Sequence, residues 1–139
     1  MADGNLLAAE DPLNMVLLRG ALAIIAGIAV FALALVAMNA GGKALLGDDP
    51  EWINRSTSTQ VLWLCVNAVC MMAGGYVAAW LAPRARVAHA ILVSAIQAGF
   101  TLAAFLTLNN QTTPTWLWIG GIVATVPAAW IGARLRGPA

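Results

Sequence analysis

Charged residues are few in this chain, and the long uncharged runs between them are the feature that most constrains its fold. Seven Lys and Arg and six Asp and Glu occur in 139 residues. They are Asp3, Glu10, Asp11, Arg19, Lys43, Asp48, Asp49, Glu51, Arg55, Arg84, Arg86, Arg134 and Arg136. The runs at 20–42, 56–83 and 87–133 contain stretches of the roughly 20 apolar residues that cross a bilayer as a helix. A polar cluster at 109–114, ending in proline, divides the last run and is typical of a turn.

These runs predict an all-α, integral membrane bundle of four transmembrane helices, at about 20–41, 60–82, 87–108 and 115–134. We expect a single transmembrane domain over 1–139, with 1–11 as an N-terminal tail and 42–59 as an outer loop. Asp11-Pro12 is typical of a helix N-cap followed by proline in the first turn, so the first helix should begin there. Asp49-Pro50 repeats the pattern and predicts a short interfacial helix in the outer loop.

The composition excludes several classes of protein. Apolar residues make up 61% of the chain and charged residues 9%, whereas soluble domains have about 45–50% and about 25%. A water-soluble fold of this length would need far more polar surface. The net charge of +1 offers no electrostatic footprint for nucleic acid. A soluble enzyme, a nucleic-acid-binding protein and a disordered chain are therefore not expected.

Basic residues predict the orientation in the membrane. Five Arg residues fall on one predicted side and only Lys43 and Arg55 on the other, so both termini should be cytoplasmic. The expected inner-interface anchors are Trp80, Arg84, Arg86, His89, Trp130, Arg134 and Arg136. Trp52, Trp63, Trp116 and Trp118 would mark the outer interface. The Ala-, Gly- and Arg-rich, Lys-poor composition favours a bacterial inner (plasma) membrane location, with the lipid bilayer as the immediate partner.

The chain resembles itself in two places. Residues 78–86, which run from Ala-Ala-Trp to Arg-Ala-Arg, match 128–136, which run from Ala-Ala-Trp to Arg-Leu-Arg, and 19–25 resembles 86–92. This pattern is consistent with a tandem repeat of two helical hairpins in the same orientation. The alternative is convergence, because helices that leave the membrane inward tend to end in Trp and then Arg. Both interpretations stay open.

Small residues at helical spacing predict where the helices pack, because close backbone approach drives association in lipid. The expected packing or interface positions are Gly27, Gly74, Ala78, Gly120, Ala124, Ala128 and Gly132. These positions give the helices more small-residue faces than the packing of one bundle requires. We therefore expect the chain to pack against other membrane-protein subunits or against copies of itself. Pro127 lies inside the fourth helix and predicts a bend, static or acting as a hinge.

Two amides are the main polar residues within the predicted spans. No Asp, Glu, Lys or Arg lies in any span, which disfavours a proton-coupled exporter of the small four-helix type. Asn67 lies in the second span and Gln97 in the third. They either line a polar path that takes a small ligand or form one interhelical hydrogen bond, worth about 0.6 kcal/mol, that fixes the helix register. We favour the hydrogen bond.

No pattern for catalysis or metal binding occurs in the sequence. His89 is the single histidine, so haem or metal ligation would need further ligands, and interfacial packing is expected instead. Cys65 and Cys70 face different sides of one helix and should not form a disulfide with each other. We therefore predict that the chain is not an enzyme and binds no cofactor and no metal.

One hairpin carries a family resemblance. Gly74-Gly75-Tyr76-Val77-Ala78-Ala79, followed by His89-Ala90, resembles a hairpin of uncharacterised small bacterial four-helix integral membrane proteins. The resemblance covers about an eighth of the chain and implies an inner-membrane location and no activity. The Val66-Asn67 step is shared with fluoride channels, but their Phe- and Thr-rich filter pattern is missing.

The sequence leaves two functions to compare. The leading expectation is an accessory or stabilising subunit that packs against a larger inner-membrane complex or against its own copies. The alternative is a small oligomeric channel or transporter with Asn67 and Gln97 along its path.

Overall fold

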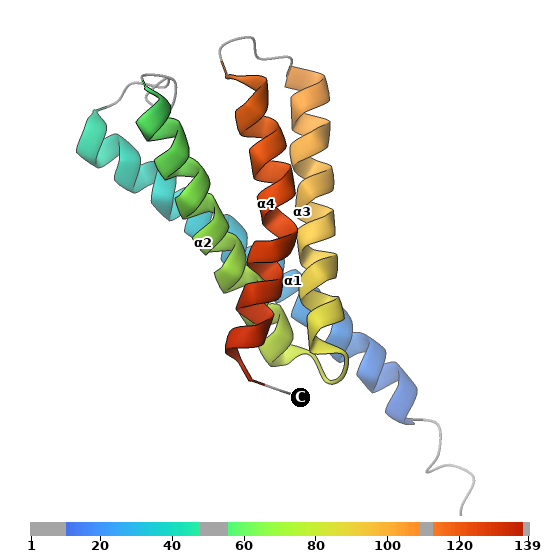
Figure 1. Cartoon of the computed structure of the whole chain (residues 1–139). Coiled ribbons are helices and arrows are strands. Elements are labelled where there is room, and N and C mark those ends of the chain that lie inside the picture. The colour runs from blue at the N-terminus through green and yellow to red at the C-terminus, as the bar shows by residue number, and fades with distance from the viewer. Residues whose placement is uncertain (1–10, 48–55, 109–112, 138–139) are drawn as a thin grey trace, which may run out of the picture.

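The computed structural model, described here for residues 11–47, 56–108 and 113–137, contains four helices. They are α1 (Asp11–Leu46), α2 (Thr57–Leu81), α3 (Arg86–Leu108) and α4 (Thr115–Leu135). Each is long and apolar enough to cross a membrane. The prediction of an all-α structure with four helices able to span a membrane is therefore confirmed, as expected of a multi-pass membrane protein. Figure 1 shows the helices alternating in direction.

The helix ends follow local sequence. α1 begins at Asp11, where the Asp-Pro pair predicts it, and continues past residue 42 to Leu46. The predicted outer loop at 42–59 is therefore shorter, because Lys43 suits a helix C-terminus and Gly47, at φ +88°, supplies a left-handed cap whose N–H donates to the Lys43 carbonyl at 3.0 Å. Ser56 caps α2 by accepting from the Thr59 N–H at 3.2 Å. The predicted interfacial helix after Asp49 lies outside the described residues.

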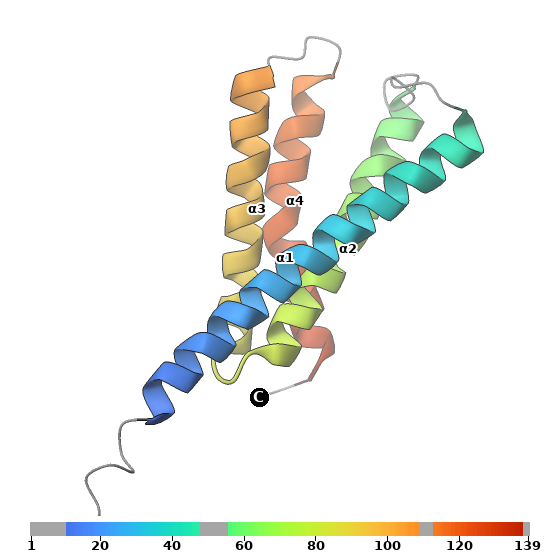
Figure 2. The same ribbon diagram turned by 180° about the vertical axis from the view of Figure 1, so that it is seen from behind.

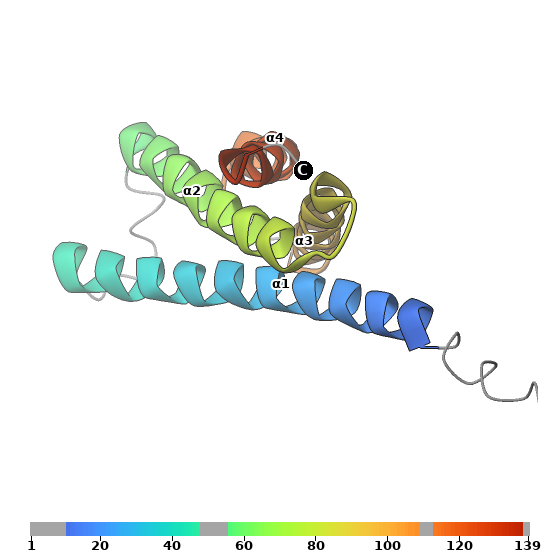
Figure 3. The ribbon, with the colours of Figure 1, turned by 90° about the horizontal axis from the view of Figure 1, so that it is seen from below.

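α2 is the central helix of the bundle. α2 and α3 each contact all three other helices, but the two largest interfaces of the bundle are those of α2 with α4 and with α1. Seen from the end where α2 and α4 finish, α1 and α4 lie on opposite sides of α2 (Figure 3). α1 is 36 residues long, about 54 Å at 1.5 Å per residue, and it runs diagonally across the bundle (Figure 2).

The two ends of the bundle differ in composition. The basic end, defined by Arg84, Arg86, Arg134 and Arg136, holds the α2–α3 turn and the end of α4, and α1 starts on the same side (Figure 1). Ala85 in that turn has φ +49°, and the backbone N–H of His89 donates to its carbonyl at 3.3 Å. The opposite end is where α1 finishes and α2 and α4 begin. Towards it the α1–α2 pair diverges from the α3–α4 pair in both side views.

Candidate binding cavity

Near the basic end, glycines let the helix backbones touch. A Cβ added to Gly74 would lie 2.7 Å from the Gly27 carbonyl oxygen, and one added to Gly75 would lie 2.6 Å from the Ala129 carbonyl oxygen. A Cβ at Gly132 would collide with the Met72 carbonyl oxygen. We call this region, in which α1 and α4 both press on α2, the closed half. Contacts this close leave no room for side chains between the helices.

Hydrogen bonds at the basic end hold the closed half together. The Arg136 guanidinium donates to the carbonyl oxygens of Ala79 at 2.9 Å and Trp80 at 2.8 Å, in the last turn of α2. These bonds satisfy carbonyls that a helix end leaves without an intrahelical partner. The Arg134 guanidinium lies 5.1 Å from the centre of the Trp130 ring, in cation–π range. The two Arg136 hydrogen bonds tie the end of α4 directly to the end of α2.

His89 packs against α1 near the basic end. Its Nδ1 lies 3.1 Å from the Ala85 carbonyl oxygen. Its Nε2 would be 2.9 Å from a Cβ on Gly20, so the ring lies directly against α1. Across the described ranges, no three His, Cys, Asp or Glu residues gather where they could hold a metal.

The opposite half of the bundle contains a cavity of about 420 Å³ between the two diverging helix pairs. All four helices contribute to its wall. The lining residues are Phe31, Leu35, Trp63, Asn67, Gln97, Phe100, Thr101, Ala104, Thr113, Leu117, Trp118 and Gly121. None of these described residues is charged. We call this half of the molecule the cavity half.

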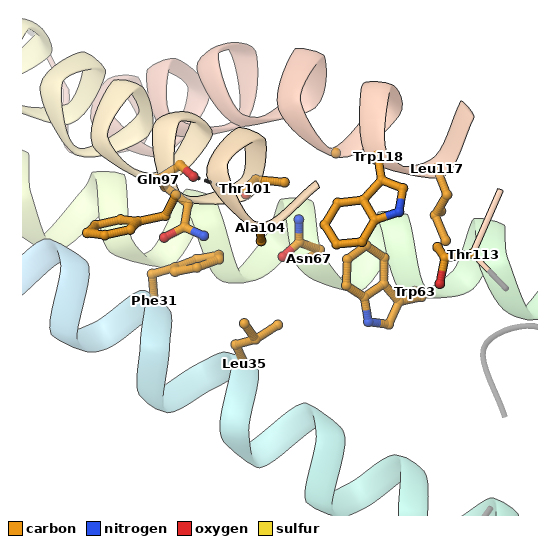
Figure 4. Close-up of a pocket in the computed structure, with 12 residues that line it drawn as sticks. Phe31, Leu35, Trp63, Asn67, Gln97, Thr101, Ala104, Thr113, Leu117 and Trp118 are labelled. Carbon is orange, nitrogen blue, oxygen red and sulfur yellow. Dashed lines mark hydrogen bonds between the residues drawn. The ribbon is translucent and has the colours of Figure 1, made fainter. Parts of the chain in front are cut away.

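Asn67 and Gln97 enter this cavity from α2 and α3, and Phe31 and Leu35 of α1 face them (Figure 4). Asn67 is only 7% exposed. Among residues 11–47, 56–108 and 113–137, neither side-chain amide has a hydrogen-bond partner. The two residues therefore share one cavity without forming the interhelical hydrogen bond that the sequence favoured. Each amide keeps both its donors and its acceptor for another molecule.

Other polar residues at similar depth are satisfied by their own helices. The hydroxyls of Ser94 and Thr125 donate to the carbonyls of Ile91 and Ile122, each at 2.7 Å. The Thr101 hydroxyl, on the cavity wall, donates to the backbone carbonyl of Gln97 at 3.0 Å. Short hydroxyl side chains reach a carbonyl three or four residues earlier. The side-chain amides of Asn67 and Gln97, by contrast, line the cavity without bonding another described residue.

Trp63 lines both the main cavity and a second one. The second cavity, of about 320 Å³, lies between α1 and α2 and is lined by Met38, Gly41, Gly42, Leu45, Leu62, Trp63 and Val66. The Trp63 Nε1–H is buried and has no acceptor among the described residues. Among the described residues, this indole is the only polar side chain that lines the second cavity, so the cavity offers little to orient a solute.

The residues predicted to pack between helices differ in how deeply the structure buries them. Gly27, Gly74, Ala78, Ala128 and Gly132 are buried, and the glycines make the close contacts of the closed half. Gly120 and Ala124 lie half-buried at the edge, while their neighbours Gly121 and Thr125 are buried. These faces therefore pack within one chain.

Sequence reasoning missed the aromatic wall. Trp63 and Trp118 were assigned to the membrane interface, and Phe31 and Phe100 carried no assignment. Hydropathy indicates the depth of a residue but not the direction in which it points. The ring of Trp118 is supported by Phe105, with centroids 5.9 Å apart at 48°.

Comparison of the chain with family models, curated proteins and solved structures gives no significant match. The resemblance of the 74–90 hairpin to small bacterial four-helix membrane proteins therefore stays a prediction.

Proposed function

We propose that this chain is a non-catalytic membrane protein that carries a small solute across the bilayer, with the cavity as the solute site. The observation that carries the proposal is the pair of amides, Asn67 and Gln97, that share one cavity without bonding another described residue. Both lie close to the middle of their helices, which is the depth at which transporters bind their substrates. Small-molecule sites commonly combine apolar walls with a few convergent polar groups.

The closed half favours a transporter over a standing pore. The glycine contacts of Gly27, Gly75 and Gly132 lie between the cavity and the basic end. A solute that entered from the opposite end would therefore stop beside Asn67. Passage requires the two helix pairs to separate at the basic end, as in alternating access. The proposed orientation places the basic end in the bacterial cytoplasm, because Arg residues concentrate there.

A test is the reaction of a cysteine in the cavity with a charged, membrane-impermeant thiosulfonate. In a Cys65→Ser/Cys70→Ala background, we expect Thr101→Cys to react in proteoliposomes, because a solute route must hold water. Val69→Cys is the lipid-facing control, with Val69 61% exposed on the bundle surface, and Ser94→Cys is the fully buried control. Neither control should react. If Thr101→Cys fails to react with the reagent added on either side of the membrane, the transport function is excluded.

An accessory subunit is the competing proposal. It was motivated by small-residue faces that needed a partner, but Gly27, Gly74 and Gly132 find their contacts within the chain. Purification in a gentle detergent, followed by native mass measurement, separates the two functions. A stoichiometric complex with a larger protein would favour the accessory role, whereas the chain alone or in copies of itself would favour transport.

A further inference from the structure

We infer that the cavity binds an uncharged, planar aromatic molecule that carries a carboxamide or lactam group. This inference rests on the proposed function, because it names the class of solute that the cavity would carry. Three properties of the wall support it: its charge, its hydrogen-bonding groups and its shape.

The wall selects against charge. None of the described lining residues is ionisable. A carboxylate or ammonium group that entered the cavity would leave water without finding a counter-charge, which is costly at membrane depth. An uncharged solute avoids this cost.

The hydrogen-bonding groups of the cavity wall favour a ligand that carries a donor next to an acceptor. The amides of Asn67 and Gln97 each offer an N–H donor and a carbonyl acceptor. The Thr101 hydroxyl donates its proton to the backbone carbonyl of Gln97, so toward a ligand it can only accept. A carboxamide or lactam satisfies both kinds of group. A ketone or quinone has acceptors only, and would leave the side-chain oxygens of Asn67 and Gln97 without a donor.

The shape selects for a flat ring. Four aromatic residues, Phe31, Trp63, Phe100 and Trp118, come from four different helices and line one cavity. Figure 4 shows Phe31 and Trp118 on opposing helices with Asn67 between them along the cavity. Aromatic walls favour stacked or edge-on contacts with planar rings. The volume of about 420 Å³ falls in the range of sites for small organic ligands.

The experiment compares four naphthalenes that share one ring system, each at equilibrium with the chain in lipid nanodiscs. The probes are naphthalene-2-carboxamide, the matching carboxylate, 2-acetylnaphthalene and 2-naphthylmethylammonium. Binding to empty nanodiscs is subtracted, so that partition into lipid is removed. We expect the carboxamide to bind about tenfold or more tightly than each of the other three.

Substitutions locate the binding. Asn67→Leu and Gln97→Leu should each weaken carboxamide binding by about tenfold, since each removes one amide from the cavity. The matched control is Asn39→Leu. The Asn39 amide already donates to the Leu35 carbonyl at 2.9 Å within α1, and Asn39 is not among the residues that line the cavity. This variant should bind the carboxamide as the unchanged chain does.

The outcomes separate the solute class from the transport function. Tighter binding of the carboxylate or the ammonium compound would overturn the class, as would equal binding of the ketone. Carboxamide binding that neither cavity variant weakens would also overturn it. The transport function is tested separately, by the reaction of Thr101→Cys with the thiosulfonate, so its failure can be distinguished from failure of the solute class.

Discussion

The closed half and the cavity half are built from the same four helices, yet they pack in opposite ways. In the closed half, backbone meets backbone at Gly27, Gly74, Gly75 and Gly132, and Arg136 ties α4 to α2. In the cavity half, large aromatic side chains from the diverging helices line a space of about 420 Å³. In lipid, where hydrophobic burial does not drive helix association, residue size at the crossing decides whether two helices touch or separate.

Substitution at the tightest backbone contact should have the largest effect on stability. Gly132→Ala places a Cβ against the Met72 carbonyl, and because this is backbone, neither helix can yield by a side-chain rotation. We expect the free energy of unfolding to fall by about 2 kcal/mol, measured by denaturation in detergent. Gly121→Ala is the matched control in the same helix, since its Cβ would have open space. It should leave stability unchanged or raise it by less than about 1 kcal/mol. Equal losses in both variants would contradict the division into two halves.

Removal of the Arg136 hydrogen bonds should have an intermediate effect. Arg136→Gln loses both bonds to the end of α2 at Ala79 and Trp80. We expect a loss of about 1–2 kcal/mol in the free energy of unfolding, measured as above. Arg134→Gln, which loses only the contact with the Trp130 ring, should cost about 0.5–1 kcal/mol. A larger cost at Arg134 would show that the closed half is not held through Arg136.

The coupling between the two cavity amides should be the smallest effect. A double-mutant cycle with Asn67→Leu and Gln97→Leu should give an interaction energy near zero for folding, because the two amides are not bonded to each other. A hydrogen-bonded pair between membrane helices would give about 0.6 kcal/mol. A coupling of that size would restore the earlier interpretation, in which the pair only fixes the helix register.

The sequence predicted that Asn67 and Gln97 act as a pair, and the structure places both in one cavity. The sequence could indicate this pair because polar residues are rare in the predicted spans, so the few that occur stand out. The aromatic part of the wall was not predictable in the same way. Phe31 and Phe100 are two apolar residues among many, and nothing in their local sequence distinguishes a side chain that faces a cavity from one that faces lipid.

By itself, the sequence determined that this chain has four helices, each long and apolar enough to cross a membrane. Each span follows from a local property, the absence of charge over about 20 residues, since every backbone polar group in lipid must be satisfied within its own helix. Only the tertiary structure decided which small residues meet, that α2 is the central helix, and that the two pairs diverge around Asn67 and Gln97. Those features depend on how the faces of several helices fit together, and a single run of residues carries no information about its partners in space.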